Sequence, residues 1–155
     1  ETIGSTLIRK KLEDGDIAKA NALLGRNYFI EGTVIHGNAL GRTLNMPTAN
    51  IVPDKSKLLL PSGVYASKVK IEGDSHIYKG VTNVGRKPTI GRYDIGVETC
   101  LLDFDRDIYD KKITVEFYEY IRHEKKFPGL DELKNQMEKD KERAKNILKK
   151  QNAYY

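Results

Sequence analysis

Short runs of β-type residues, separated by turn residues, fill the middle of this chain of 155 residues. Five such runs are rich in β-branched and aromatic residues, and they cover residues 28–35, 63–71, 76–84, 96–104 and 112–121. The second and third are joined by Glu72-Gly73-Asp74-Ser75, a hairpin signal, and the positions expected to face inward there are Val69, Ile71, Ile77 and Val81. No segment between the runs holds the roughly 10 to 15 residues of helical pattern that parallel strands need between them. The sequence therefore predicts a mainly β fold, with an antiparallel sheet closed into a barrel or a sandwich.

Helical periodicity is confined to the two ends of the chain. Residues 1–25 predict two short helices, the second capped by Asp16 and ended by Gly25. Residues 130–150 carry an apolar stripe with acidic residues in the first turn and lysines in the last, and we expect this long helix to lie across the barrel. Asp140 interrupts the stripe. It is either an edge position that reaches water, which we favour, or a carboxylate paired with an arginine of the barrel.

Composition narrows the class of protein. Hydrophobic residues make up 39% and charged residues 32%, and no run approaches the ~20 apolar residues of a membrane-spanning helix. The net charge of +5 suits an anionic partner, but basic and acidic residues alternate, so charge alone does not identify it. The single cysteine, Cys100, cannot form an internal disulfide, and residues 1–11 show no secretory signal. We therefore expect a cytoplasmic protein with no membrane segment.

A long stretch rich in glycine and proline, residues 37–61, is where we expect the chemistry, because such connections inside compact domains are usually functional. It begins with two glycines, Gly37 and Gly41, followed by Arg42. The spacing does not match a Walker phosphate loop, so a turn is the simpler interpretation. Glycine backbone N–H groups and an arginine could nonetheless hold a phosphate.

Thr48 and Asn50 follow Pro47 at a spacing of two, so in an extended segment their side chains project the same way. Two neutral oxygen ligands suit Mg²⁺ when nucleotide phosphates supply the negative ligands. Spacing alone favours a turn in which Asn50 bonds its own backbone.

Glu98 lies in a β-type run with apolar neighbours on both faces, and alternation places it on one face with Cys100. It is either a solvated strand residue, which the residues alone favour, or a base held at a cleft. The three histidines lack metal-ligand spacing, and no GxSxG or HExxH motif occurs, so zinc and hydrolase classes are excluded.

Taken together and in order, these segments resemble riboflavin kinases. The resemblance covers the chain from about residue 25 to its end, and it rests on Gly32, Val34, Gly37, Gly41 and Arg42, on Pro47-Thr48-Ala49-Asn50, on Leu60-Pro61 and Gly63-Val64-Tyr65-Ala66, on Asn83-Val84-Gly85 and Pro88-Thr89, on Val97-Glu98, on Leu102-Asp103-Phe104 and Tyr109, and on Arg122, Glu124, Lys126 and Phe127. Residues 5–9 and 22–26 resemble the end of the adenylyltransferase half of bacterial bifunctional riboflavin kinase/FMN adenylyltransferases. The resemblance therefore divides the chain into a helical connector, residues 1–25, and a kinase domain, residues 26–155.

The resemblance implies a six-stranded antiparallel Greek-key barrel that transfers the γ-phosphoryl of ATP to the terminal ribityl hydroxyl of riboflavin, giving FMN and ADP with Mg²⁺. The implied partners are these substrates and products and, in a longer enzyme, the adenylyltransferase domain. Neither nucleic acid nor membrane is implied. No FAD synthesis is expected from this chain, because residues 1–25 cannot build a second nucleotide-binding domain.

The resemblance also implies roles for individual residues. Thr48 and Asn50 match the magnesium-binding pair, and Glu98 matches the catalytic base. ATP binding falls to Gly37, Gly41, Arg42, Pro47, Thr48 and Asn50. Flavin binding falls to Asn83, Val84, Gly85, Pro88, Thr89 and Arg122.

Three positions depart from the family pattern: Asn45 and Asp110 stand where glycine is usual, and Cys100 stands where a histidine often follows the glutamate. None of them is the metal pair or the base. Two alternative functions remain at this point, a flavin-binding redox barrel and a basic OB-like barrel that binds nucleic acid. The second would need aromatic and basic residues interleaved on one sheet face, whereas the tyrosines here are dispersed.

Overall fold

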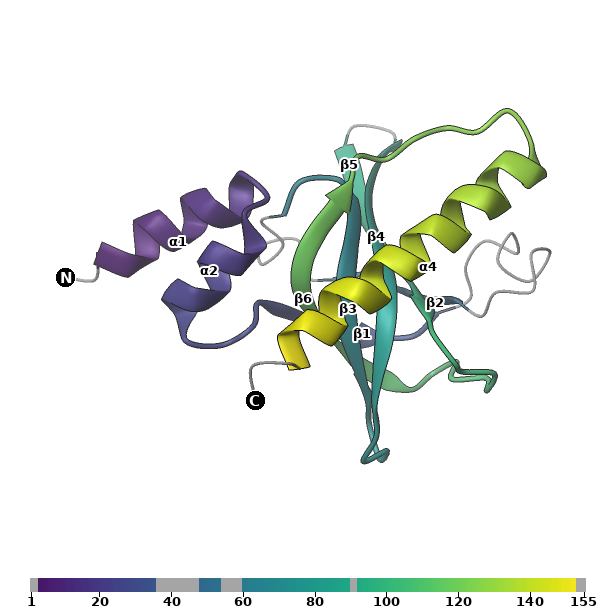
Figure 1. The fold of residues 1–155 in the computed structure, drawn as a ribbon, viewed down its shortest axis with the longest axis horizontal. Coiled ribbons are helices and arrows are strands. Elements are labelled where there is room, and N and C mark those ends of the chain that lie inside the picture. Colours follow the sequence, from purple (N-terminus) through teal and green to yellow (C-terminus); the bar gives the residue numbers. More distant parts are fainter. Residues whose placement is uncertain (1–2, 36–47, 54–59, 90–91, 153–155) are drawn as a thin grey trace.

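The computed structural model describes residues 3–35, 48–53, 60–89 and 92–152, in which six antiparallel strands form one curled sheet accompanied by three α-helices (Figure 1). The elements are α1 (Ile3–Glu13), α2 (Ile17–Leu24), β1 (Phe29–Thr33), β2 (Thr48–Ile51), β3 (Gly63–Ile71), β4 (Ile77–Thr89), β5 (Arg92–Leu101), β6 (Lys112–Arg122) and α4 (Leu130–Asn152). The strand order is β1-β6-β3-β4-β5-β2. The sheet curls into a half-barrel whose edges approach at a bridge between Ile35 and Asn50. The predicted six-stranded antiparallel fold with a C-terminal helix is confirmed.

The two N-terminal helices end where the sequence predicts. Asp16 caps α2 by accepting a hydrogen bond from the Lys19 backbone N–H, and Gly25 ends it in the left-handed conformation, with φ of 75°. The Asn21 side chain then ties α2 to the sheet: its Nδ2 donates to the Phe117 carbonyl at 2.8 Å, and its Oδ1 accepts from the Tyr28 N–H at 2.7 Å. The helical pair is therefore fixed to β6.

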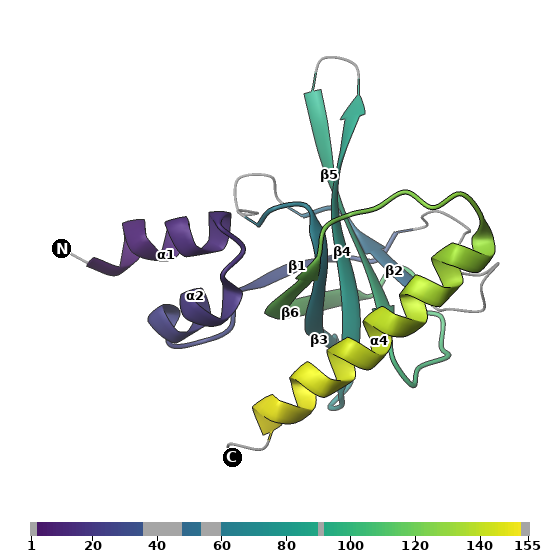
Figure 2. The same cartoon turned by 45° about the horizontal axis from the view of Figure 1, so that its top comes forward.

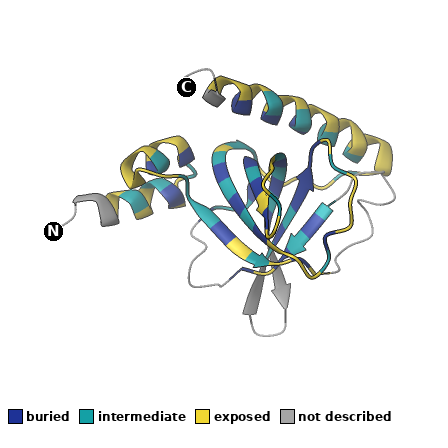
Figure 3. Cartoon of the chain, turned by 90° about the horizontal axis from the view of Figure 1, so that it is seen from below, coloured by how far each residue is buried: buried dark blue, intermediate teal, exposed yellow. Residues whose placement is uncertain are grey.

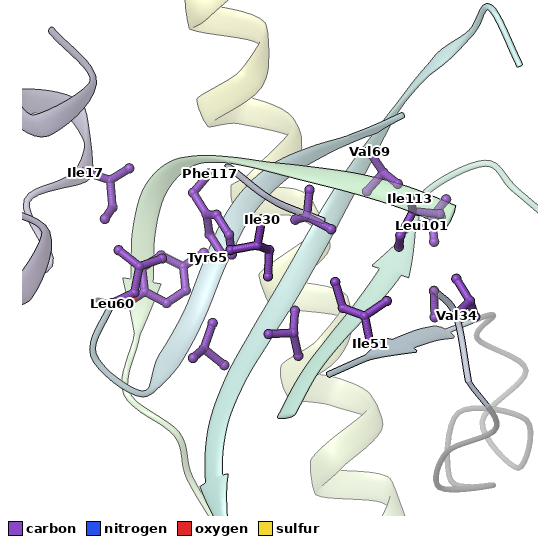
Figure 4. Close-up of a cluster of buried hydrophobic side chains, with 14 of the residues drawn as sticks. Ile17, Ile30, Val34, Ile51, Leu60, Tyr65, Val69, Leu101, Ile113 and Phe117 are labelled. Atoms are coloured by element: carbon purple, nitrogen blue, oxygen red, sulfur yellow. The ribbon is translucent and has the colours of Figure 1, made fainter. Parts of the chain in front are cut away.

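The interior of the half-barrel holds the main hydrophobic core (Figure 4). At one end of it, the Tyr65 and Phe117 rings form a T-shaped pair with ring centroids 5.4 Å apart. The side chains of Ser67, Thr82 and Thr99, each with a hydroxyl, are also fully buried in this interior. Thr82 Oγ1 lies 2.7 Å from Ser67 Oγ and 2.9 Å from Thr99 Oγ1, so this hydroxyl ladder links β3, β4 and β5.

Of the four positions in β3 and β4 that the sequence predicted to face inward, two do so. Val69 and Ile71 are buried in the core as expected, but Ile77 is 55% exposed and Val81 packs on the outer face beneath α4. The reason is that α4 makes the outer face of the sheet apolar as well, so an apolar residue does not by itself mark the interior.

Three strands differ from the sequence prediction. β2 lies in the stretch that was expected to be irregular, and it pairs with β5, so the favoured turn at Asn50 is wrong. β4 and β5 extend as a hairpin to the pair Thr89 and Arg92, well beyond the predicted ends, and Figure 2 shows this hairpin projecting from the sheet. The sequence of this hairpin is mostly polar and lacks the alternation of apolar and polar residues that predicts a strand.

α4 crosses the outer face of the sheet, as predicted, and Figure 3 shows its buried positions along the side that faces the strands. Ala144, Ile147 and Leu148 pack there around Ala66 of β3. In the described part of the chain, none of the helices combines the length and the apolar character needed to cross a membrane. The C-terminal half of α4 therefore packs on apolar strand residues of the outer face, whereas its N-terminal half lies over polar strand residues.

Candidate active site

A pocket lies between the outer face of the sheet and the first half of α4. Its walls come from five strands, the connection between β6 and α4, and α4 itself, and they are formed by Thr48, Val64, Val81, Asn83, Glu98, Cys100, Arg122, Lys125, Phe127, Leu133, Met137 and Asp140. A concave, partly apolar site with a few convergent polar groups is typical of small-molecule binding.

Strand register places the main polar groups of the pocket in one row. Asn50 of β2 lies opposite Glu98 of β5, Glu98 lies opposite Asn83 of β4, Asn83 lies opposite Val64 of β3, and Val64 lies opposite Arg122 of β6. Directly opposite residues in antiparallel strands share a face, with Cβ atoms roughly 5 Å apart. This polar row therefore crosses the sheet beneath α4.

Glu98 lies between Asn50 and Asn83 in the polar row and is half-buried. The residues alone favoured a solvated strand position, and the structure places Glu98 in the wall of the pocket, which agrees with the alternative of a position at a cleft. The alternation that put Glu98 and Cys100 on one face is correct, since both line the same pocket. A half-buried carboxylate in a cleft is placed to accept a proton from a bound hydroxyl.

Thr48 and Asn50 project from β2 on the pocket side, because Thr48 pairs with Cys100 and Asn50 with Glu98. Their hydroxyl and amide oxygens, near one carboxylate, form the hard and nearly neutral donor set that suits Mg²⁺ together with nucleotide phosphates. Among the described residues there is no cluster of three or more His, Cys, Asp or Glu that could hold a metal ion alone. The donors present therefore fit a magnesium ion that a nucleotide brings with it.

Asn83 presents a buried acceptor that the described residues do not satisfy. Its Oδ1 is shielded from solvent and has no hydrogen-bond partner among them. Leaving such an atom unpaired costs about 1–3 kcal/mol, which a ligand that donates a hydrogen bond would recover. The amide lies next to Glu98 in the polar row, so a ligand hydroxyl is a suitable donor.

Arg122 ends the polar row and is bound to α4. Its Nη2 donates to Asp140 Oδ2 at 2.8 Å, and its Nε donates to Asp140 Oδ1 at 2.9 Å. Asp140 is only 3% exposed, so the favoured interpretation of this residue as an edge position in water is wrong. The alternative, a pair with an arginine of the barrel, is confirmed. Charge pairing explains how a carboxylate is tolerated in the apolar stripe of α4.

Cys100 forms part of the apolar wall of the pocket, against Leu133 and Met137. Burial raises the pKa of its thiol, against a smaller opposing effect of the Lys141 charge. The thiol therefore stays protonated at neutral pH and contributes an apolar surface.

The remaining residues implied by the family resemblance are distributed differently. Gly37, Gly41, Arg42, Pro47 and also Asn45 lie outside the described residues. Pro88 and Thr89 belong to the projecting β4–β5 hairpin. The Val84 side chain is in the barrel core, and a Cβ at Gly85 would come within 2.9 Å of a Glu124 carboxylate oxygen. Val84 could therefore meet a ligand only through its backbone.

Several pocket residues were missed from the sequence. Phe127 lies beneath two cations, with the Arg122 guanidinium carbon 5.8 Å and Lys125 Nζ 5.6 Å from its ring centroid. Phe127 belongs to the family-like segment after β6, so that signal was available. Leu133 and Met137 looked like ordinary members of an amphipathic stripe, and nothing local distinguishes a helix residue over a pocket from one over a core.

A family model described as "Flavokinase: Riboflavin kinase" matches residues 24–148. The chain belongs to the riboflavin kinase family. The bifunctional riboflavin kinase/FMN adenylyltransferase of Bacillus subtilis is 45% identical over 145 residues, which cover 92% of this chain and 45% of that protein. This chain thus spans about half the length of that curated relative.

Two solved structures resemble the fold. A Streptococcus pneumoniae structure described as a macrolide-efflux protein has a TM-score of 0.86 and 35% identity, covering 92% of this chain and 46% of that one. Riboflavin kinase from Trypanosoma brucei has a TM-score of 0.58 and 25% identity, covering 79% of this chain and 80% of that one. The second structure links the half-barrel with its C-terminal helix to a protein named as a riboflavin kinase of similar length.

Proposed function

We propose that this chain is a cytoplasmic ATP:riboflavin 5′-phosphotransferase that produces FMN and ADP. The observation that carries the proposal is the polar row beneath α4, in which Glu98 stands between Asn50 and Asn83. A phosphoryl-transfer site needs an anchor for metal-bound phosphate, a group to orient the attacking hydroxyl and a pocket for the acceptor. In this proposal the row supplies these three in order across the sheet, and membership of the riboflavin kinase family supports riboflavin as the acceptor.

Thr48 and Asn50 are the proposed ligands of Mg²⁺, which when bound with ATP would neutralise charge on the phosphates. Gly37, Gly41, Arg42 and Pro47 are proposed to bind the nucleotide. Their support is the family resemblance alone. The edge strand β2 then marks the nucleotide side of the pocket, because it carries both metal ligands.

Glu98 is the proposed base. The riboflavin 5′-hydroxyl oxygen forms a bond to the γ-phosphorus while the bond to the β–γ bridging oxygen breaks, ADP leaves, and the hydroxyl proton passes to the Glu98 carboxylate. In a loose transition state this transfer comes late, so Glu98 chiefly orients the hydroxyl. Base assistance of this kind is typically worth roughly 10²- to 10⁴-fold in rate.

Asn83 and Arg122 are the proposed side-chain contacts of the flavin, and Val84 would contribute its backbone. Gly85, Pro88 and Thr89 are proposed as flavin-binding residues on the family resemblance alone. The unsatisfied Oδ1 of Asn83 supports a hydrogen bond from a ribityl hydroxyl. The apolar wall formed by Cys100, Leu133 and Met137 suits the ring system. The chain is proposed to divide at residue 25 into a connector and a kinase domain, with an adenylyltransferase domain as partner in longer enzymes.

The test is ADP release by the purified chain with ATP and Mg²⁺, with and without riboflavin, together with identification of FMN by mass. We expect release to require riboflavin and to match FMN one to one. Riboflavin-independent ATP hydrolysis, or a yellow protein that performs redox chemistry without ATP, would contradict the proposal. Salt-dependent binding to single-stranded DNA without kinase activity would favour a nucleic-acid barrel, which the burial of Tyr65 and Phe117 inside the sheet disfavours.

A further inference from the structure

We propose that Asp140 of α4, braced by Gln136, is the positioning residue that holds the Arg122 guanidinium in the substrate pocket. The proposal rests on the proposed function, because it assigns α4 a part in riboflavin binding. It begins from the geometry of the ion pair. Nε and Nη2 of Arg122 both donate to the Asp140 carboxylate, at 2.9 and 2.8 Å, in the two-pronged arrangement that fixes the plane of a guanidinium.

Other contacts fix Arg122 further. Its Nη1 donates to the His123 carbonyl at 2.9 Å, and its guanidinium carbon lies 5.8 Å from the centroid of the Phe127 ring. Gln136 Nε2 donates to Asp140 Oδ1 at 3.0 Å, which holds the carboxylate itself. The guanidinium is thus held along one edge by α4, at one corner by the backbone, and near an aromatic ring.

The contacts of Arg122 with Asp140 and with the His123 carbonyl leave part of its guanidinium available to a ligand. A guanidinium has five N–H groups, and the contacts above use the Nε–H, one on Nη2 and one on Nη1. Arg122 and Asp140 both line the pocket, so the two remaining N–H groups are donors beside the ligand space. Two donors held in one plane suit a planar ring with carbonyl acceptors, which the pyrimidine-dione end of riboflavin provides.

Burial makes each charge of the Arg122–Asp140 pair depend on the other. The Asp140 side chain is 4% exposed and that of Arg122 21% exposed, so neither charge is well solvated without the other. Removing one partner leaves an uncompensated buried charge, and a freed arginine side chain has many alternative rotamers. An uncharged residue at position 140 would therefore change where Arg122 points before any substrate arrives.

The experiment measures riboflavin binding by quenching of its fluorescence without ATP, and separately the KM values for riboflavin and ATP, kcat and the thermal midpoint. For Asp140→Asn we expect the riboflavin Kd and KM to rise about 10- to 100-fold, the range for loss of a charge-assisted hydrogen bond, while the KM for ATP stays unchanged. Glu142→Gln removes the same charge from an exposed position of α4 and should leave every value unchanged.

Gln136→Met keeps the helix and the ion pair and removes only the brace, so it tests the proposal even if Asp140→Asn folds poorly. We expect a rise of a few-fold in the riboflavin Kd. Combined with Arg122→Lys, Asp140→Asn should add little further loss, because both act through one guanidinium. An unchanged riboflavin Kd in a folded Asp140→Asn variant, or equal losses for riboflavin and ATP, would overturn the proposal. Failure of the unmodified chain to bind or phosphorylate riboflavin would instead overturn the proposed function.

Discussion

Glu98 is flanked in the polar row by the amide side chains of Asn50 and Asn83. Under the proposed function, phosphate anchored at Asn50 and a hydroxyl bound near Asn83 would meet in front of its carboxylate. Side-chain order along the row therefore matches the order of the reacting groups. These two neighbours of Glu98 make different demands on a substitution experiment, because in the proposed mechanism Asn50 serves the metal and Asn83 the acceptor.

Glu98→Gln should lower kcat by roughly 10² or more, because the amide keeps the size of the side chain but cannot accept the proton. The thermal midpoint and ATP binding should be preserved. Riboflavin-dependent ADP release and thermal unfolding of each variant provide the measurement. Glu119→Gln, an exposed glutamate on β6, is the matched control and should change neither value. Equal activity of the two variants would leave the mechanism without this base.

Asn50→Ala should abolish turnover while the fold survives, because it removes one of two neutral oxygen ligands from the proposed magnesium site. Calorimetric titration of Mg²⁺ and ADP into the variant should show much weaker binding than in the unmodified chain. Asn146→Ala, at an exposed position of α4, controls for loss of an asparagine elsewhere. Near-normal kinase activity of Asn50→Ala at low Mg²⁺ would refute the assignment.

Residue-level inference from the sequence was limited because it placed α4 across the barrel without showing which strand residues the helix covers. Alternation correctly placed Glu98 and Cys100 on one face, but it could not tell whether that face was open or covered. The same gap explains Asp140, whose partner Arg122 lies on β6 and comes near only when α4 folds back over the sheet. The family resemblance supplied the proposed roles of Thr48, Asn50 and Glu98, which the residues alone left ambiguous.

Elements were predictable wherever their signals are local. The caps of α2, the hairpin between β3 and β4, and the stripe of α4 are all encoded within a few residues, and the structure contains each of them. β2 was missed because its four residues lie among glycines and prolines, and only pairing with β5 makes them a strand. Strand existence there depends on a partner about 50 residues away, which no local pattern reveals.

The β3–β4 hairpin is tied to the β5–β6 connection by Asp74. Its carboxylate accepts hydrogen bonds from the His76 backbone N–H at 2.8 Å and from the Tyr78 hydroxyl at 2.7 Å, and it pairs with Arg106 at 2.6 Å. These contacts, the backbone bond first, lower the pKa of Asp74 from its ordinary value of 3.8 to about 2. The charged form is therefore the one that holds these elements together.

A carboxyl whose pKa is lower in the folded state stabilises the protein above its ordinary pKa and loses that effect as the pH falls through the folded value. The thermal midpoint of the unmodified chain should therefore decline between about pH 4 and pH 2 in part through Asp74. Asp74→Asn should have a lower midpoint at neutral pH and a shallower decline in that range. Asp105→Asn, at an exposed position nearby, should follow the unmodified chain. Parallel curves for all three proteins would contradict the prediction.

In the whole molecule, the two faces of one sheet have different roles. The inner face holds the core, and the outer face holds the polar row and its roof, α4. Figures 1 and 2 both place α1 and α2 on the side away from the start of α4, so the helical connector does not reach the pocket. The described part of the site is therefore formed by the half-barrel and α4.

The chain of 155 residues should convert riboflavin to FMN and stop there. Adenylyl transfer needs a nucleotide-binding domain of its own, and neither the antiparallel sheet nor two short helices provides a doubly wound one. Incubation with riboflavin, ATP and Mg²⁺, followed by chromatographic separation of FMN and FAD, is the measurement. The bifunctional Bacillus subtilis relative serves as the positive control. FAD formed by the pure chain would contradict the prediction.

The hydroxyl ladder of Ser67, Thr82 and Thr99 has a consequence for the opposite side of the sheet. Because side chains alternate, a slip of one residue between β4 and β5 would turn Glu98 into the apolar interior and the hydroxyl of Thr99 outward. The hydrogen bonds of the ladder form in only one register of these strands, and any other register would leave buried hydroxyls unpaired. The ladder thus fixes the strand register on which the polar row depends. Variants at these three positions should therefore behave like active-site variants, although a ligand in the pocket would not touch them.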